Sequence, residues 1–356
     1  MTTTLDQSRS EAFAERLVAA FNDAALVLMI SIGHRTRLLD LLAASGPVTS
    51  AELARESGLE ERYVREWLGA MTTGRIVELD PTSERYALPA EHAAWLTRPA
   101  SPDNLAVMAQ YLGILGSVED DVIACFESGG GVPYDRFGRF HEVMAEDSGQ
   151  AVLTALDDQI LPLVPGVTDR LEEGIRVADL GCGRGRALAQ LARRFPRSSF
   201  VGVDLSAEAI AWATEATAEL ENVRYEVRDL RTFDVDAEPA RFDFVTTFDA
   251  VHDQPAPLAL LTGIRRSLAP GGVYLMQDID GHSDHNANLD HPLGPFLYSV
   301  SCMHCMTVSL AQGGEGLGTM WGVEKADELL RAAGFETIDY HRLDHDPVNV
   351  YVVARP

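Results

Sequence analysis

Glycines and an aspartate with a defined spacing occur in the stretch VADLGCGRGRALAQLA, residues 177–192. An apolar strand enters a turn that contains Gly181, Gly183 and Gly185, and a helix follows, so a ligand can approach the backbone closely. The spacing is G-x-G-x-G, whereas the dinucleotide fingerprint is G-x-G-x-x-G. Asp179 stands two residues before the first glycine, where its carboxylate would repel a pyrophosphate. The turn therefore favours a ligand with a positive amine over a dinucleotide.

Two further acids stand where the next strands end. Asp204 ends the second strand, where a carboxylate can accept hydrogen bonds from ribose hydroxyls, and Asp229 ends the third, where it can take the adenine amino group. S-adenosylmethionine has an ammonium and a sulfonium but no phosphate, so these features predict a site for it. The alternative is that each aspartate only caps a helix. The predicted cofactor site, with Phe248 or Asp249 beside the methyl group, comprises Asp179, Gly181, Cys182, Gly183, Gly185, Asp204, Leu205, Asp229, Leu230, Phe248 and Asp249.

A histidine follows the fourth strand, in FDAVHDQP. The reaction expected of S-adenosylmethionine is methyl transfer, an in-line displacement at the sulfonium methyl. This reaction needs an aligned acceptor and often the removal of a proton. His252 should lie beside the glycine turn in such a sheet, and a neutral imidazole near pH 7 suits a phenol or an acid-activated hydroxyl. His252 is therefore the candidate base. The alternative is a histidine that caps the strand end and shapes the pocket.

Histidines and cysteines gather in DIDGHSDHNANLDHPLGPFLYSVSCMHC, residues 278–305, which should overhang the active site. A C-x-x-C pair without a second pair or well-spaced histidines is a weak zinc signal, so no metal site is predicted. Tyr298, Cys302 and Cys305 share a helical face, which is more often core or pocket wall. Soft sulfur near the pocket would also suit a thiol or metalloid acceptor.

A glycine-rich loop with aromatic residues spans 129–141. Aromatic rings after three glycines are typical of a mobile lid over a flat or apolar acceptor. The alternative is a surface loop that ordinary hydrophobic contacts hold in place. The predicted substrate-binding residues, from this loop and from the later part of the chain, are Tyr134, Phe137, His141, Tyr298, Cys302 and Trp321.

The elements that must position these residues follow an alternating pattern from residue 175 onward. Short apolar strands alternate with helices, which predicts a doubly wound parallel sheet. The last two strands, ETIDYHRL and NVYVVAR, are separated by DHDP and should form an antiparallel pair at the end of the sheet. The predicted fold is α/β, a Rossmann-like seven-stranded doubly wound sheet with a terminal antiparallel hairpin, plus an N-terminal α-helical winged-helix domain.

The N-terminal part has a helix-turn-helix pattern. Helices are expected within 11–45, and Thr49 with Glu52 forms a capping box for a short helix. A second helix follows over 60–71, and the strands 76–79 and 86–88 form a hairpin, as in a winged helix. The predicted domains are 1–100 for winged helix and dimerisation, 101–170 for a helical linker with the lid, and 171–356 for S-adenosylmethionine binding.

Composition limits the possible partners. The net charge of −25, from 54 acids and 29 bases, repels nucleic acid and anionic membrane surfaces. The N-terminal stretch MTTTLDQSRSEAF is polar and not a signal peptide, and the apolar run 24–32 is too short to span a bilayer. Four cysteines in so long a chain do not form a disulfide framework. A cytoplasmic protein is therefore expected.

Residues 175–356 resemble a class I S-adenosylmethionine-dependent methyltransferase. VADLGCGRG resembles the first motif of that family, FVGVDLS its acidic loop, and VRDL its adenine-binding motif. HRTRLLDLLAASGPVTSAELARESGLEERYVREWL resembles the N-terminal dimerisation domain of small-molecule O-methyltransferases, which implies a homodimer. The whole chain resembles bacterial winged-helix methyltransferases often labelled transcriptional regulators. The resemblance also implies that His252 and Asp253 form a catalytic pair, although Gln254 replaces the tryptophan that commonly follows.

Two classes of function fit these observations. The first is a homodimeric enzyme that methylates a small molecule, with oxygen as the first choice of acceptor and nitrogen the second, and releases S-adenosyl-L-homocysteine. The second is a DNA-binding regulator that senses S-adenosyl-L-methionine; a catalytically silent cofactor-binding partner is a third possibility. Residues 1–100 carry 14 acids and 10 bases, and a reader of the DNA groove needs a basic face. Charge therefore favours the enzyme.

Overall fold

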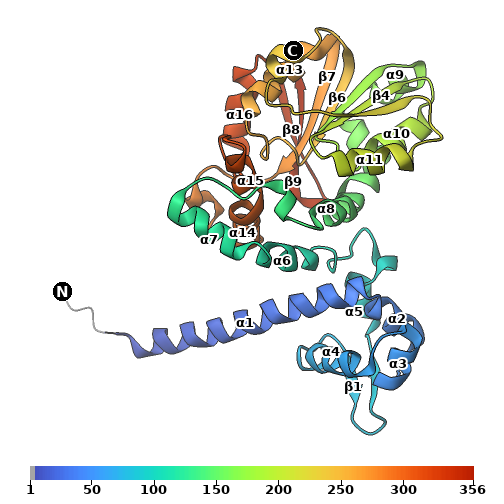
Figure 1. Cartoon of the computed structure of the whole chain (residues 1–356), viewed down its shortest axis with the longest axis vertical. Helices are drawn as coiled ribbons and strands as arrows, with labels where there is room; N and C mark the ends of the chain where they lie inside the picture. The colour runs from blue at the N-terminus through green and yellow to red at the C-terminus, as the bar shows by residue number, and fades with distance from the viewer. Residues whose placement is uncertain (1–4) are drawn as a thin grey trace. The chain divides into compact units, whose positions relative to one another are not determined.

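The computed structural model describes residues 5–356, so the first four residues of the predicted N-terminal domain lie outside the described residues. The chain divides into two compact units, Met1–Ile114 and Leu115–Pro356. Figure 1 shows the elements of both units. Each unit has its own hydrophobic core, and the candidate site described below belongs to the second unit alone.

The first unit is a winged helix, as predicted. Its core is formed by the apolar faces of the short helices, with Leu39, Leu53 and Leu68 fully buried. The capping box at Thr49 and Glu52 is present, and Glu52 also forms an ion pair with Arg85 of the hairpin at 2.9 Å. The elements are α1 Gln7–Arg35, α2 Leu38–Ser45, α3 Ser50–Ser57, α4 Glu61–Thr73, β1 Glu78–Asp80, β2 Arg85–Ala87, α5 Ala90–Leu96 and the 3-10 turn Arg98–Ala100.

Helix α1 is longer than the apolar run at 24–32 suggested. It has 29 residues, begins after the N-cap Asp6, and exposes large apolar side chains along its length. One 18-residue window has a mean hydropathy of 1.6 and is only 17% buried, so the helix could cross a membrane by length and composition alone. The exposed apolar residues of α1 are Phe13, Leu17, Val18, Phe21, Leu28 and Ile32.

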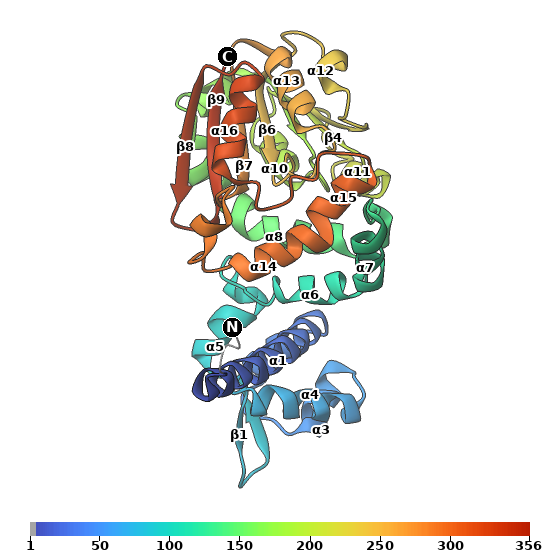
Figure 2. The same cartoon turned by 90° about the vertical axis from the view of Figure 1, so that its left-hand side faces the viewer.

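The second unit contains the predicted seven-stranded sheet, in the order β5-β4-β3-β6-β7-β9-β8. Five strands are parallel, and β9 pairs antiparallel with both β7 and β8, so the terminal hairpin closes one edge of the sheet (Figure 2). The strands are β3 Arg176–Leu180, β4 Ser199–Asp204, β5 Val223–Val227, β6 Phe242–Phe248, β7 Leu268–Ile279, β8 Thr337–Leu343 and β9 Asp346–Arg355. This confirms the predicted fold class.

Helices cover both faces of this sheet because its strands are apolar on both sides. Ala178 and Leu180 of β3 pack in one cluster with α13 and α16, whereas Val177 packs on the opposite face with α9 and α10. The helices next to the strands are α9 Val167–Glu173, α10 Arg186–Arg194, α11 Ala207–Ala216, α12 Phe233–Asp236, α13 Pro257–Ser267 and α16 Gly322–Ala332.

Two helical segments complete the chain, and parts of each line the candidate site. The first precedes the sheet and includes the glycine-rich loop, and the second follows β7. Both contain π-helical turns, which often occur at functional sites. The elements are α6 Ala109–Gly116, α7 Glu119–Ser128, the 3-10 turn Tyr134–Arg136, α8 Phe140–Ser148, the π turns Gly149–Leu153 and Leu156–Ile160 and the 3-10 turn Leu161–Leu163, followed later by the 3-10 turn His285–Asn288, α14 Gly294–Val300, the π turn Ser301–Cys305 and α15 Met306–Ala311.

Candidate active site

A cavity of about 630 Å³ opens where the strands β3 and β4 end. The strand order reverses at β3, between β4 and β6, and ligands of open α/β sheets bind at such a point. The cavity is lined by every residue of the predicted cofactor site, from Asp179 through Asp249. The structure therefore brings together residues that four successive strands deliver to one edge of the sheet.

The glycine turn needs glycine at two positions for a steric reason. Gly181 and Gly185 have positive φ angles of 75° and 61°. A Cβ atom at Gly181 would lie 2.5 Å from the Cβ of Ala250, and one at Gly185 would lie 2.3 Å from Cε1 of Tyr225. These close approaches keep the backbone of the turn at the cavity wall, where a ligand can reach it.

Asp179 is a buried carboxylate at the end of β3, with 3% of its surface exposed. The hydroxyl of Thr246 donates a hydrogen bond to Asp179 Oδ1 at 2.8 Å. Burial nevertheless raises the pKa of Asp179 to about 7, and the nearby Asp204 carboxylate adds to that rise. A buried carboxylate of this kind is stabilised in its charged form by a cationic ligand.

Asp204 holds the glycine turn in place. Its Oδ2 accepts a hydrogen bond from the Gly183 backbone N–H at 2.8 Å, and its Oδ1 accepts one from the Ser206 N–H at 2.8 Å. The N-cap of α11 is Ser206 rather than Asp204. Asp229 is more exposed and accepts a hydrogen bond from the Arg231 N–H at 2.9 Å. Helix capping therefore does not account for Asp204.

His252 lies behind the cavity wall. It is 2% exposed and does not line the cavity, whereas Asp253 does. Its Nε2 lies 3.3 Å from Asp253 Oδ1, and its Nδ1 lies 2.7 Å from Asp278 Oδ1. Burial lowers the pKa of His252, but the carboxylates of Asp278 and Asp253 outweigh this and raise it well above its usual value. The side chain that faces the cavity from this pair is Asp253.

Asp278 is a site residue that the sequence reasoning missed. It is 1% exposed near the end of β7, and its Oδ1 accepts hydrogen bonds from the Trp321 indole N–H at 3.0 Å and the Ile279 N–H at 2.9 Å. The sequence carries a signal for it, since Asp179, Asp204 and Asp229 each stand at a strand end. The same criterion applied to the fifth strand, GVYLMQDI, selects Asp278.

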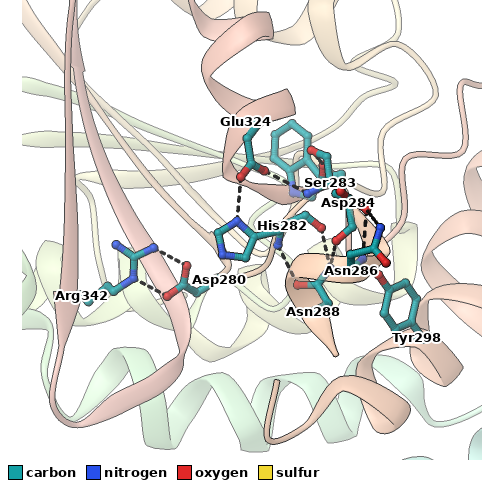
Figure 3. Close-up of polar contacts among 10 residues, drawn as sticks. Asp280, His282, Ser283, Asp284, Asn286, Asn288, Tyr298, Glu324 and Arg342 are labelled. Atoms are coloured by element: carbon teal, nitrogen blue, oxygen red, sulfur yellow. Dashed lines mark hydrogen bonds and ion pairs between the residues drawn. The ribbon is translucent and has the colours of Figure 1, made fainter. Parts of the chain in front are cut away.

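The predicted substrate-binding residues separate into two groups. Tyr134, Phe137 and His141 line the cavity, whereas the other three do not. Trp321 is buried and donates a hydrogen bond to Asp278. Tyr298 accepts a hydrogen bond from the Asn288 amide at 3.0 Å (Figure 3). The side chains outside the cavity wall are Tyr298, Cys302 and Trp321.

The glycine-rich loop is anchored to the helix that follows residue 300. The Val132 N–H donates to the Thr307 hydroxyl at 2.8 Å, and a Cβ atom on Gly131 would lie 1.9 Å from the Thr307 carbonyl oxygen. The ring of His304 stacks on Phe140 with centroids 3.4 Å apart, and Tyr134 stacks on His141 at 4.8 Å. These contacts hold the loop in place, and its residues line one side of the cavity.

The histidines at 282–291 have separate partners. His282 Nδ1 lies 2.7 Å from Glu324 Oε1, and Ser283 N–H donates to Oε2 of the same residue at 2.9 Å (Figure 3). Burial would raise the pKa of Glu324, but the hydrogen bonds from His282 and Ser283 lower it to about 2. His291 Nε2 lies 3.1 Å from the Asp280 carbonyl oxygen. These contacts hold the loop after β7 in place. They do not bring the histidines of this loop together in one site.

Two family models match the chain. Residues 24–98 match the Rv2258c-like winged HTH domain, and residues 171–334 match a methyltransferase domain. The two matches coincide with the helix-turn-helix of the first unit and with the sheet of the second.

Curated relatives are similar to part of the chain. Trans-aconitate 2-methyltransferase of Deinococcus radiodurans is 36% identical over 110 residues, 31% of this chain and 40% of that protein. Fatty-acid O-methyltransferase of Mycolicibacterium smegmatis is 34% identical over 108 residues, 30% of this chain and 38% of that protein. The chain thus spans about two fifths of the length of these relatives.

Solved structures are similar over the whole chain. Human N-acetylserotonin methyltransferase in complex with SAM has a TM-score of 0.68 at 20% identity, with 100% of this chain and 99% of that chain covered. Mitomycin 7-O-methyltransferase has a TM-score of 0.70 at 17% identity, with 99% and 100% covered. At such identities the similarity shows the fold. The chain combines an N-terminal winged helix-turn-helix domain with a C-terminal methyltransferase domain.

Proposed function

We propose that this protein transfers a methyl group from S-adenosylmethionine to a small-molecule acceptor, with oxygen as the first choice of acceptor atom and nitrogen as the second. The observation that carries this proposal is that one cavity is lined both by all predicted cofactor residues and by aromatic residues of the glycine-rich loop. Some relatives and structural neighbours support oxygen, since their names describe O-methyltransferases of fatty acids, of ubiquinone biosynthesis and of mitomycin.

The cofactor would occupy the part of the cavity nearest the strand ends. Asp179, buried and with a raised pKa, pairs with the ammonium of the methionine part. Asp204 accepts hydrogen bonds from the ribose hydroxyls while it holds the glycine turn, and Asp229 accepts the adenine amino group. Phe248 or Asp249 then lies beside the methyl group. The positive sulfonium suits a cavity that several carboxylates line.

The acceptor would lie between Asp253 and the rings of Tyr134 and Phe137, which line the same cavity. A carboxylate in this position accepts a hydrogen bond from the acceptor O–H and turns an oxygen lone pair toward the methyl group. His252 holds Asp253 from behind, at 3.3 Å. His252 was expected either to act as the base or to cap the strand end and shape the pocket, and we propose that it instead positions the carboxylate that binds the acceptor.

The direct test is incubation of the purified protein with methyl-labelled S-adenosylmethionine and panels of phenols, carboxylic acids and amines, followed by mass spectrometry. Transfer of label to members of the oxygen panels supports the proposal. Transfer only to amines overturns the choice of acceptor atom. Cofactor binding without transfer to any panel favours the regulator over the enzyme.

A homodimer formed through the first unit, in the cytoplasm, is part of the proposal. The exposed apolar residues of α1 support it, since soluble proteins rarely leave such a stripe uncovered. Sedimentation of the purified protein tests the dimer. Phe21→Glu on α1 should give monomers, and a dimer that persists in this variant places the interface elsewhere.

A DNA-binding regulator remains the second candidate, because residues 24–98 match a winged helix-turn-helix model. In helix α4, Arg62 forms an ion pair with Glu66 and Arg65 forms one with Glu61. These pairs leave little free positive charge on the helix that would enter the groove. Electrophoretic mobility shifts with random and genomic DNA test this candidate, and salt-sensitive binding in the nanomolar range would favour it.

A further inference from the structure

We propose that the floor of the cavity binds a divalent transition-metal ion of the zinc class, held by Cys305 Sγ, His252 Nε2 and Asp253 Oδ1. The metal site goes beyond the proposed methyl transfer, and binding of the ion does not depend on that function. The combination of thiolate, imidazole and carboxylate matches the ligands that zinc prefers.

The spacing of the three side chains fits one small ion. One ligand atom from each residue lies within 4.8 Å of the other two. His252 Nε2 and Asp253 Oδ1 are 3.3 Å apart. Two ligands at about 2.1 Å from a tetrahedral zinc ion are roughly 3.4 Å apart. The histidine and the aspartate therefore already stand at the edge length of a zinc tetrahedron.

The imidazole of His252 is held by a carboxylate on one ring nitrogen, as zinc-binding imidazoles usually are. Its Nδ1 lies 2.7 Å from Asp278 Oδ1, which assigns the proton to Nδ1 and leaves Nε2 available as a ligand. Asp278 is itself fixed by the Trp321 indole N–H and the Ile279 N–H. A carboxylate–histidine pair with its own supporting hydrogen bonds is the usual outer shell of a zinc site.

The charges and unfilled hydrogen bonds of the cluster favour a cation. The carboxylates of Asp253 and Asp278 flank a single imidazole, and Asp249 converges with His252 and Asp278 in a second group of potential ligands. Within residues 5–356, Asp278 Oδ2 is buried and accepts no hydrogen bond, and Asp253 Oδ1 is buried with His252 Nε2 3.3 Å away. Buried carboxylate charge is costly, and a divalent ion at the cluster would compensate Asp253 directly.

The cluster borders the cavity through one of its three proposed ligands. Asp253 lines the cavity, whereas His252 and Cys305 form the layer behind it and are buried. Three protein ligands with a fourth position open to a cavity is the pattern of a catalytic rather than a structural zinc ion. If the proposed function holds, the ion would polarise the acceptor oxygen while Asp253 Oδ2 accepts its proton.

The chain contains a matched control for this proposal. Cys302 lies three residues before Cys305 in the same π turn and is not among the residues whose ligand atoms converge. The C-x-x-C pair noted in the sequence is therefore not the site, because only its second cysteine faces His252 and Asp253. Cys302→Ser changes the same atom in the same turn and should leave the metal site intact.

The experiment is a titration of the full-length, chelator-treated protein with cobalt(II) chloride, monitored by absorption. We expect a thiolate-to-cobalt charge-transfer band and the strong visible bands of a tetrahedral ion, saturating at one cobalt per chain and abolished by zinc. Cys305→Ser should lose the charge-transfer band, and Cys302→Ser should keep it. Circular dichroism and thermal unfolding verify that each variant is folded.

A further variant covers the case in which Cys305→Ser does not fold. Asp278→Asn removes the outer-shell carboxylate and should weaken zinc binding about 10- to 100-fold. The proposal is overturned if the native protein gives no charge-transfer band, or if Cys302→Ser rather than Cys305→Ser removes it. S-adenosylhomocysteine binding is measured separately, so its absence beside an intact cobalt spectrum would refute the proposed function and leave the metal site standing.

Discussion

The affinity for S-adenosylmethionine should fall in mild acid because of Asp179. Its pKa is raised to about 7 by burial, and only the ionised carboxylate can pair with the cofactor ammonium. A group with this pKa is about three-quarters ionised at pH 7.5 and about one-tenth ionised at pH 6.0. The dissociation constant should therefore rise about eightfold between these two pH values.

The assay is calorimetric titration of the native protein and of Asp179→Asn between pH 5.5 and 7.5. The native protein should show the acid-side loss of affinity, and the variant should bind weakly with little dependence on pH. A flat profile in the native protein would contradict the ammonium assignment. An equal slope in Asp179→Asn would show that another group titrates.

The same substitution should stabilise the protein when no ligand is bound. Raising the pKa of a carboxyl from 3.8 to about 7 disfavours folding at neutral and higher pH, because the unfolded chain releases the proton more readily. Each pKa unit is worth about 1.4 kcal/mol, so the cost reaches about 4 kcal/mol at pH 8. Asp179→Asn should thus unfold at a higher temperature than the native protein at pH 8, and by a smaller margin at pH 5. A lower unfolding temperature at pH 8 would refute the argument.

Three other substitutions test neighbouring parts of the account. Asp204→Ala removes hydrogen bonds to the glycine turn and to the ribose. The lost charge-assisted hydrogen bonds are worth about 3 kcal/mol of binding free energy, so cofactor affinity should fall about 100-fold. Normal affinity in titration would show that the strand-end assignment is wrong. His252→Ala should leave cofactor binding nearly intact and lower turnover about 100-fold or more, and unchanged turnover would exclude His252 from the chemistry. Gly185→Ala would place a Cβ atom 2.3 Å from the Tyr225 ring and should abolish cofactor binding, which fluorescence or calorimetric titration measures; full binding would mean that the turn adapts.

Much of the second unit was predictable from local pattern. The strands of an α/β sheet are short apolar runs, and their carboxyl ends share one edge, so the acids after successive runs must approach one another. Asp179, Asp204 and Asp229 line one cavity for this reason. The winged helix was predictable in the same way, because the capping box at Thr49 and Glu52 marks a helix start on its own.

The other parts of the site depend on packing that no local pattern encodes. Whether Cys302 or Cys305 faces His252 is decided by a π-helical turn, which shifts the helical phase by about one residue. Trp321 lies behind the cavity because its indole N–H donates a hydrogen bond to Asp278. The two residues are far apart in the chain, so no local pattern indicates this contact. The contiguous apolar run 24–32 is too short to span a bilayer, whereas an 18-residue window of the whole helix α1 is apolar enough to do so.

The central claim is that the cavity at the ends of β3 and β4 binds S-adenosylmethionine. Calorimetric titration of the purified protein with S-adenosylmethionine and with S-adenosylhomocysteine tests it most directly. We expect micromolar binding of both at pH 7.5, in a ratio of one per chain, with a large loss in Asp204→Ala. Absence of binding by both ligands in a folded sample would contradict the claim, and the winged helix would then be the part of the protein to test on DNA.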